Sequence, residues 1–249
     1  MAHADLREFL GVLEQQKLLS RVKVEVDPVY ELGAILRRVF DERGPAVLFE
    51  NVKGSSIPLV SGVMDTFKRY GLGIGASNNP REIMERVLWA LQNPTAPVLV
   101  DHGVCQENVM RGDEVDLLSM PVPLWHRLDG GKFIGTLGVL IVKDPETGAR
   151  NIGIYRLQLH GANRIGLNQT QQIGVIYQKW QQRGQPMPVV TAIGVDPYVL
   201  ASSCCRPPLG YDELGTAGAL QGSPVELVRC KTIDHEAPAN AEIILEGEV

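Results

Sequence analysis

The chain has 249 residues, of which 44% are hydrophobic and 21% are charged, and its formal net charge is −5. These are ordinary values for a globular protein, and the length allows one large domain or two modest ones of about 100–200 residues each. The acidic balance and the absence of a clustered basic run exclude a nucleic-acid partner. No apolar run reaches the ~18–20 residues of a membrane span, and no signal-peptide pattern opens the chain, so we expect a cytoplasmic protein.

Residues 1–115 predict an α/β domain. Apolar residues at helical spacing indicate a helix over residues 4–16, and alternating polar and apolar residues indicate a strand over 21–26. Asp27 is expected to be the N-cap of a second helix, with Pro28 at its first position. Further along the chain, the pattern predicts strands at 46–50 and 58–62 and a helix that begins at Pro80.

Residues 116–249 predict a β-rich domain that follows an extended, proline-rich segment at 117–128. Strands are expected at 132–142 and 151–159, joined as a hairpin by turn residues at 144–148, and a helix at 171–183. Further strands are expected at 188–195, 225–231 and 242–249. A chain seldom ends within a sheet whose edge is bare, so the last strand predicts either a covering partner or further sequence.

No short motif in the sequence is specific evidence for a phosphate-binding loop or a metal site. The glycine run 70–75 follows a segment that looks helical instead of a strand, so it indicates a helix terminus and not a phosphate loop. The four cysteines lack metal-site spacing, and we expect reduced thiols. None of the five histidines stands at metal-ligand spacing from another ligand.

Arg156 stands out because the strand around it is otherwise built largely of apolar or aromatic residues. A guanidinium keeps its charge, so a partly buried arginine needs an anion, whereas an arginine on an exposed strand face needs none. Asn151 and Arg156 have opposite strand parity and should face opposite sides. A bulge at Gly153 could bring both toward one site.

Four segments together resemble the UbiD family, and their order and spacing extend the resemblance over essentially the whole chain. They are Gly130–Thr136, Asp144–Gln158, Ala217–Val228 and Pro238–Gly247. The resemblance implies a (de)carboxylase of aromatic or α,β-unsaturated acids that uses prenylated FMN (or FMN), usually with Mn²⁺ and K⁺. It also implies an N-terminal α/β domain, a split β-barrel similar to flavin reductases, and a C-terminal oligomerisation domain.

The resemblance also implies roles for individual residues. Asn151 falls on the family's metal-ligand asparagine, and Arg156 falls on the arginine that holds the substrate carboxylate. Ile154 and Tyr155 would line the flavin. Ser202 and Ser203 fall near a loop that contacts the flavin phosphate or ring.

The sequence departs from the family pattern at the metal. The family's metal histidine falls on Gln171, within a stretch that has no histidine, and its metal glutamate falls on Gly215. Glu213 lies two residues away and could substitute. The resemblance further implies that two glutamates, one of them the proton donor, belong to a segment outside these 249 residues.

Three functions therefore stay open. The first is a carboxy-lyase acting on a small carboxylic acid, whose missing part belongs to a second subunit or to further sequence, in a homo- or hetero-oligomer. The second is a degenerate, non-catalytic subunit that binds flavin. The third is a scaffold subunit that only completes an oligomer.

Overall fold

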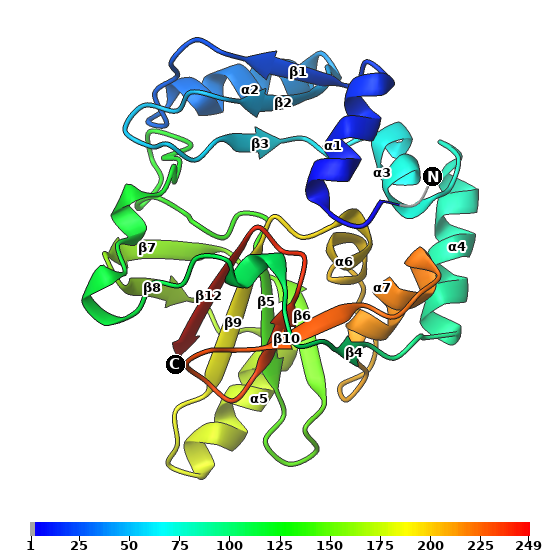
Figure 1. Cartoon of the computed structure of the whole chain (residues 1–249), viewed down its shortest axis with the longest axis vertical. Helices are drawn as coiled ribbons and strands as arrows, with labels where there is room; N and C mark the ends of the chain where they lie inside the picture. Colours follow the sequence, from blue (N-terminus) through cyan, green and yellow to red (C-terminus); the bar gives the residue numbers. More distant parts are fainter. Residues whose placement is uncertain (1–2) are drawn as a thin grey trace.

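The computed structural model describes residues 3–249, with a small N-terminal α/β region above a larger β-rich region in Figure 1. The N-terminal sheet has the order β1-β2-β3, with β1 (Leu19–Val22) parallel to β2 (Ala46–Phe49) and β3 (Leu59–Ser61) antiparallel to β2. Helices α1 (Leu6–Gln15) and α2 (Glu31–Asp41) bury apolar faces within this region. The predicted elements of this region are confirmed within a few residues.

The predicted start of the second helix is wrong. Helix α2 begins at Glu31, because the Asp27 carboxylate accepts a hydrogen bond from the Val29 N–H and forms a turn instead of a cap. Tyr30 then takes a left-handed φ of 68°, and its N–H donates to the Leu124 carbonyl at 3.0 Å. A contact with a distant segment therefore delays the helix by one turn.

The glycine run belongs to helix α3 (Phe67–Ile74), which ends at Gly75 with a left-handed φ of 70°. Thr66 caps its N-terminus by accepting from the Arg69 N–H. A Cβ on Gly73 would lie 2.9 Å from the Pro197 Cβ, so the glycine allows close packing. The prediction of a helix terminus is confirmed.

The central sheet of the β-rich region has the order β12-β9-β5-β6 and is antiparallel throughout. Its strands are β5 (Val139–Lys143), β6 (Arg150–Ile154), β9 (Pro188–Ile193) and β12 (Ile243–Glu248). Helix α5 (Gln171–Gln182) packs on one face. A hairpin of β7 (Leu157–Gly161) and β8 (Arg164–Leu167) follows β6. A third sheet has the order β11-β10-β4, from Glu236–Pro238, Glu226–Arg229 and Val98–Leu99.

The fold class, an α/β region followed by a β-rich region, is confirmed. The strands of the β-rich region within residues 3–249 form separate sheets and not a closed barrel. The long strand predicted at 132–142 is shorter, because residues before Val139 form turns. The strand predicted at 151–159 is broken into β6 and β7. Three short 3₁₀ helices lie between the regions, at Val104–Gln106, Gly112–Glu114 and Leu117–Ser119.

Two helices were not predicted from the sequence. Helix α6 (Pro197–Ser202) is short, and α7 (Glu213–Gln221) has no exposed face along residues 213–220, because each of them is buried. A helix that is apolar on all sides shows no amphipathic period. Figure 1 shows α7 beside α4 (Pro80–Gln92) and α6, where it forms part of the main core.

No helix among residues 3–249 has both the length and the apolar character needed to cross a bilayer.

We predict that Leu214→Ala lowers the free energy of unfolding by about 2–5 kcal/mol, because Leu214 is 0% exposed and its removal leaves a cavity in α7. The matched control is Leu128→Ala, since Leu128 is 96% exposed and should change stability by less than about 0.5 kcal/mol. Denaturant unfolding followed by circular dichroism measures both values. Equal effects of the two substitutions would contradict this packing.

Candidate functional site

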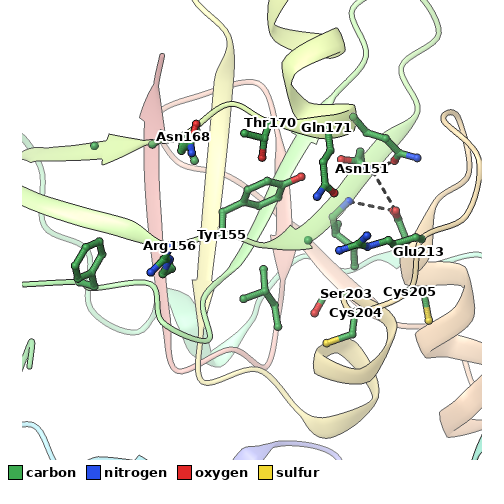
Figure 2. A pocket seen from close by; sticks show the side chains of 18 of the residues that line it. Asn151, Tyr155, Arg156, Asn168, Thr170, Gln171, Ser203, Cys204, Cys205 and Glu213 are labelled. Carbon is green, nitrogen blue, oxygen red and sulfur yellow. Dashed lines mark hydrogen bonds between the residues drawn. The ribbon is translucent and has the colours of Figure 1, made fainter. Parts of the chain in front are cut away.

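A cavity of about 940 Å³ lies between β6, the end of β8, the start of α5 and the segment that joins α6 to α7 (Figure 2). Its size suits a cofactor together with a small ligand. Most of its polar side chains come from β6 and the two residues after it, from residues 168–172, from residues 203–206 and from Glu213. These segments are distant in the sequence, and the central sheet brings them together.

Three polar side chains form a bonded cluster at one end of the cavity. The Asn151 Nδ2 group donates to Gln172 Oε1 at 2.6 Å and to Glu213 Oε1 at 3.1 Å. Glu213 Oε2 accepts from the Ile152 N–H at 3.0 Å. Asn151 and Glu213 are only 6% and 1% exposed, so the cluster is shielded from bulk water.

The carboxyl group of Glu213 is the most perturbed acid of the cavity. Burial raises its pKa to about 7, and the neighbouring charge of Asp212 adds to the increase. The hydrogen bonds from Ile152 and Asn151 act in the opposite direction without compensating for burial. No lysine, arginine or histidine within residues 3–249 forms an ion pair with Glu213, so its charge is stabilised only by neutral donors.

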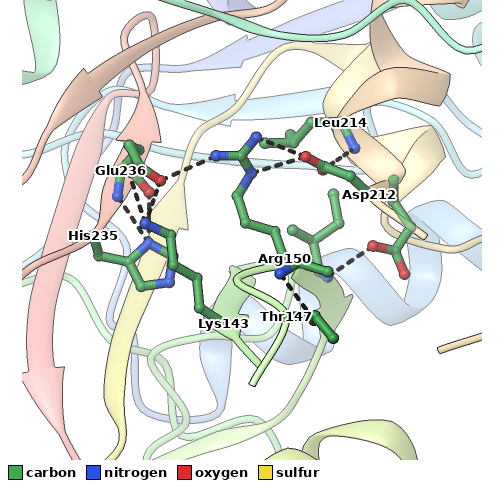
Figure 3. A network of polar contacts seen from close by, with 10 residues as sticks. Lys143, Thr147, Arg150, Asp212, Leu214, His235 and Glu236 are labelled. Atoms are coloured by element: carbon green, nitrogen blue, oxygen red, sulfur yellow. Dashed lines mark hydrogen bonds and ion pairs between the residues drawn. The ribbon is translucent and has the colours of Figure 1, made fainter. Parts of the chain in front are cut away.

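A network of ion pairs involves the residues next to the cluster in the sequence, Arg150 and Asp212 (Figure 3). Arg150 Nη2 lies 2.7 Å from an oxygen of Asp212, and Arg150 Nη1 lies 3.0 Å from Glu236. Lys143 approaches the same Glu236 at 2.7 Å. Asp212 is also the N-cap of α7 and accepts from the Leu214 N–H. Consecutive residues of β6, Arg150 and Asn151, therefore bind the consecutive residues Asp212 and Glu213.

Arg156 lines the same cavity, and in Figure 2 it lies on the opposite side of Tyr155 from Asn151 and Glu213. Its guanidinium carbon is 6.0 Å from the centre of the Phe133 ring. It is exposed, and it has no carboxylate partner among residues 3–249. This is the environment of a cation that can receive an anion.

The suggested bulge at Gly153 is wrong. β5 and β6 pair in regular register through Gly153, which stands opposite Leu140. Instead, the ladder stops after Ile154 and resumes at Leu157 in a different sheet, which leaves Tyr155 and Arg156 between the two strands. This interruption allows Asn151 and Arg156 to reach one cavity despite their opposite parity.

The other predicted residues are placed as follows. Ile154, Tyr155, Gln171 and Ser203 line the cavity, whereas Ser202 is fully buried and donates to the Val199 carbonyl. Gln171 is exposed at the first turn of α5, and its neighbour Gln172 contacts Asn151 instead.

Gly215 does not reach the cluster, because it has no side chain and its Cβ position in α7 faces Pro94, at 2.9 Å from the Pro94 Cβ. Glu213, two residues earlier, makes the contact with Asn151 without any shift of the loop.

Reasoning from the sequence missed Gln172 and Arg206, which line the cavity together with Cys204 and Cys205. The adjacent glutamines gave one available signal, because both line the cavity, although only Gln172 contacts Asn151. All four cysteines are free, as expected.

Two family models match the chain. The 3-octaprenyl-4-hydroxybenzoate carboxy-lyase N-terminal domain matches residues 10–90, and the Rift-related domain of the same carboxy-lyase matches residues 98–249. Among curated proteins, the chain is similar to a pyrrole-2-carboxylic acid decarboxylase of Pseudomonas aeruginosa. The two are 38% identical over 98% of this chain and 52% of the relative.

Solved structures give the same picture. An evolved dimeric form of the UbiD-class enzyme HmfF from Pelotomaculum thermopropionicum, in complex with prFMN, has a TM-score of 0.93 at 36% identity, over 99% of this chain and 57% of that one. Vanillic acid decarboxylase (ShVdcCD) of Sedimentibacter hydroxybenzoicus has a TM-score of 0.93 at 30% identity, over 100% of this chain and 55% of that one. The chain therefore spans about half the length of the relatives it matches.

We predict that the buried carboxyl group makes stability depend on pH. The pKa of Glu213 is about 7 in the folded protein against 4.5 for an ordinary glutamate, so the folded state binds its proton more tightly. The resulting stabilisation is complete below about pH 4.5 and is lost as the pH rises through about 7.

Relative to Glu213→Gln, whose side chain stays neutral, the metal-free parent protein should therefore lose roughly 2–3 kcal/mol of unfolding free energy between these pH values. Urea unfolding of both proteins across this range, in the presence of a chelator, measures the difference. A difference that stays constant with pH would contradict the assignment.

Proposed function

Because the chain belongs to the UbiD family of carboxy-lyases, we propose that it forms the flavin-binding part of a non-oxidative (de)carboxylase. Its substrate would be an aromatic or α,β-unsaturated carboxylic acid, and its cofactor prenylated FMN. The observation that supports this most is one cavity with an unpaired guanidinium on one side and a buried carboxylate–amide cluster on the other. Relatives described with prFMN and with FMN support the cofactor.

The cavity residues fit a bound flavin. Tyr155 and Ile154 present an aromatic and an aliphatic side chain at the point where β6 ends, and both line the cavity. Burial raises the pKa of the Tyr155 phenol, so this ring stays neutral at physiological pH. When bound, prenylated FMN supplies the electron-accepting chemistry that loss of CO₂ requires. The protein residues orient the reactants and provide the charges.

Arg156 would bind the substrate carboxylate. A guanidinium offers two parallel N–H donors that match the two oxygens of a carboxylate. Its position over Phe133 places an aromatic surface beside that carboxylate, which suits an unsaturated or aromatic acid. Because Arg156 has no carboxylate partner among residues 3–249, an incoming acid would not have to displace one.

Asn151 and Glu213 would hold a divalent cation such as Mn²⁺, with the side-chain oxygen Oε1 of Gln172 as a further ligand. Glu213 is a buried carboxylate without a cationic partner, and a hard cation is bound by such carboxylate and amide oxygens. The Asn151 amide would have to turn its oxygen toward the ion. The same donor set also suits K⁺. When bound, the ion would supply positive charge for an anionic group of the cofactor.

A second polypeptide or further sequence would complete the enzyme. Glu213 is the one carboxylate among the residues that line this cavity in the described structure, and here it belongs to the cation cluster. The proton donor would therefore come from outside these 249 residues. One relative of similar fold is itself described as a complex with two components, ShVdcCD with ShVdcD.

We predict that the protein, purified with any polypeptide that accompanies it and reconstituted with prenylated FMN, releases CO₂ from an aromatic acid. Suitable probes are pyrrole-2-carboxylate, 3,4-dihydroxybenzoate and vanillate, which are named for relatives. Arg156→Gln should lower the rate roughly 10- to 100-fold, because the carboxylate loses its charged partner. Arg183→Gln, an exposed arginine at the end of α5, is the matched control.

The outcome separates the alternatives. Flavin binding without CO₂ release from any unsaturated acid would indicate a non-catalytic flavin-binding subunit. No flavin binding at all would leave only the scaffold function.

We also predict that Glu213→Gln weakens Mn²⁺ binding roughly tenfold or more at about pH 8, where the parent carboxyl group is deprotonated. Affinity for Mn²⁺ in the parent should rise with pH through about 7, since the metal competes with the proton whose pKa is about 7. Electron paramagnetic resonance of free Mn²⁺ measures both effects. Glu226→Gln is the control, because Glu226 is exposed on β10 and lies outside the cavity. Equal affinities of the two variants would exclude Glu213 as a ligand.

A further inference from the structure

The cavity contains a second arginine, Arg206, that the proposed function leaves without a role. Arg206 lines the cavity, is exposed, and forms no ion pair with a carboxylate among residues 3–249. Two unpaired guanidinium groups in one cavity repel each other and remain hydrated unless anions are bound. The pair therefore indicates a site for two anionic groups.

The two arginines serve different parts of the cavity. Arg156 lies beyond Tyr155 from the Asn151–Glu213 cluster, as Figure 2 shows. Arg206 directly follows Cys205, which Figure 2 places on the side of Glu213. The charge of Arg206 also reaches the Tyr155 phenol, whose pKa is raised by burial and by Glu213 while Arg206 opposes that increase. Arg206 also precedes Pro207, whose carbonyl is bound by Gln172 of the cluster, so its backbone lies at the end of the cavity that holds the cluster.

The backbone on both sides of Arg206 is fixed by hydrogen bonds. The Cys205 N–H donates to the Ser202 carbonyl at 3.0 Å, at the end of α6. On the other side, the Pro207 carbonyl accepts from Gln172 Nε2 at 2.7 Å, and Gln172 in turn accepts from Asn151. The proline further restricts the backbone of Arg206 to extended conformations. The backbone that carries the guanidinium is therefore already ordered, so ligand binding does not have to supply the free energy of ordering it.

We propose that Arg206 binds the phosphate group of the flavin mononucleotide, while Arg156 remains available for the carboxylate of the substrate. This inference rests on the proposed function, because it presumes that a flavin occupies the cavity. A phosphate is the group that distinguishes FMN from riboflavin, and a guanidinium binds phosphate through paired charged hydrogen bonds. Arg206 would add positive charge to the cavity in which that phosphate and the carboxylate of Glu213 otherwise repel each other.

The test compares FMN with riboflavin, which lacks the phosphate. Flavin binding is followed by fluorescence quenching in a buffer with chelator, so that no metal ion substitutes for the guanidinium. The parent protein should bind FMN more tightly than riboflavin. Arg206→Gln should weaken FMN binding roughly 10- to 100-fold and leave riboflavin binding nearly unchanged.

Three further variants make the result specific. Arg206→Lys keeps the positive charge but loses the paired N–H donors of the guanidinium, so it should give an intermediate affinity for FMN. This variant remains informative if Arg206→Gln folds poorly. Arg156→Gln should leave the FMN-to-riboflavin ratio unchanged, because it removes a guanidinium at the other end of the cavity. Arg183→Gln makes the same change in net charge outside the cavity and should leave the ratio unchanged.

The outcomes distinguish this inference from the proposed function. If Arg206→Gln and Arg206→Lys bind FMN with the parent's preference over riboflavin, Arg206 does not hold the phosphate, although a flavin site exists. If the parent protein binds neither flavin, the proposed function fails together with this assignment. An equal loss of preference in Arg183→Gln would reduce the effect to net charge and would also overturn the assignment.

Discussion

The hydrogen bond from the Ile152 N–H to Glu213 is the contact on which the site depends. β6 is the last strand in the order β12-β9-β5-β6, so its outer edge exposes backbone groups that need partners. The Glu213 carboxylate occupies one such position, at 3.0 Å from the Ile152 nitrogen. A side chain from the first turn of α7 thereby covers a sheet edge and, in the same place, creates a buried acidic group.

That arrangement is costly for an acid, and the surrounding residues show how it is tolerated. Glu213 is 1% exposed, and its neighbour Asp212 adds a second negative charge. The charge of Asp212 is offset by Arg150, which lies 2.7 Å away. Glu213 has no such partner among residues 3–249, so burial raises its pKa to about 7. One of two adjacent carboxylates is thus paired for stability, and the other is left available for a ligand.

Much of the fold was predictable because most elements alternate between a buried and an exposed face. The helices at Leu6–Gln15, Pro80–Gln92 and Gln171–Gln182 and the hairpin of β5 with β6 follow from periodicity and turn residues. Helix α7 could not be found in this way, since a helix buried on all sides has no polar face to set its phase. The break at Tyr155–Arg156 was hidden for a related reason, because an uninterrupted strand pattern continues across it. The boundary between two domains near residue 115 stays a prediction.

The sequence predicted the kinds of residue that form the site, but not the position of every one of them. The family's metal histidine and glutamate fell on Gln171 and Gly215, one or two positions from Gln172 and Glu213, which make the contacts with Asn151. Asn151 and Glu213 were themselves the residues expected at the metal. On a helix, one position turns a side chain by about 100°, so an error of this size decides which residue contacts Asn151. Arg206 gave no signal, because the role proposed for it depends on Gln172 binding the next carbonyl, a contact between residues 35 positions apart.

The charges of the cavity connect the cluster around Glu213 with Arg206. A buried carboxylate repels any anionic group bound nearby, and the repulsion is strong where water is excluded. Positive charge near a deprotonated Glu213 would therefore favour the binding of an anionic cofactor at this end of the cavity. A cation held by Asn151 and Glu213 would supply that charge from one side, and Arg206 would supply it from the other. Gln172 joins the two, since its oxygen accepts from Asn151 and its nitrogen holds the Pro207 carbonyl. A change at Gln172 would act on both sources of positive charge at once, although the residue itself carries none.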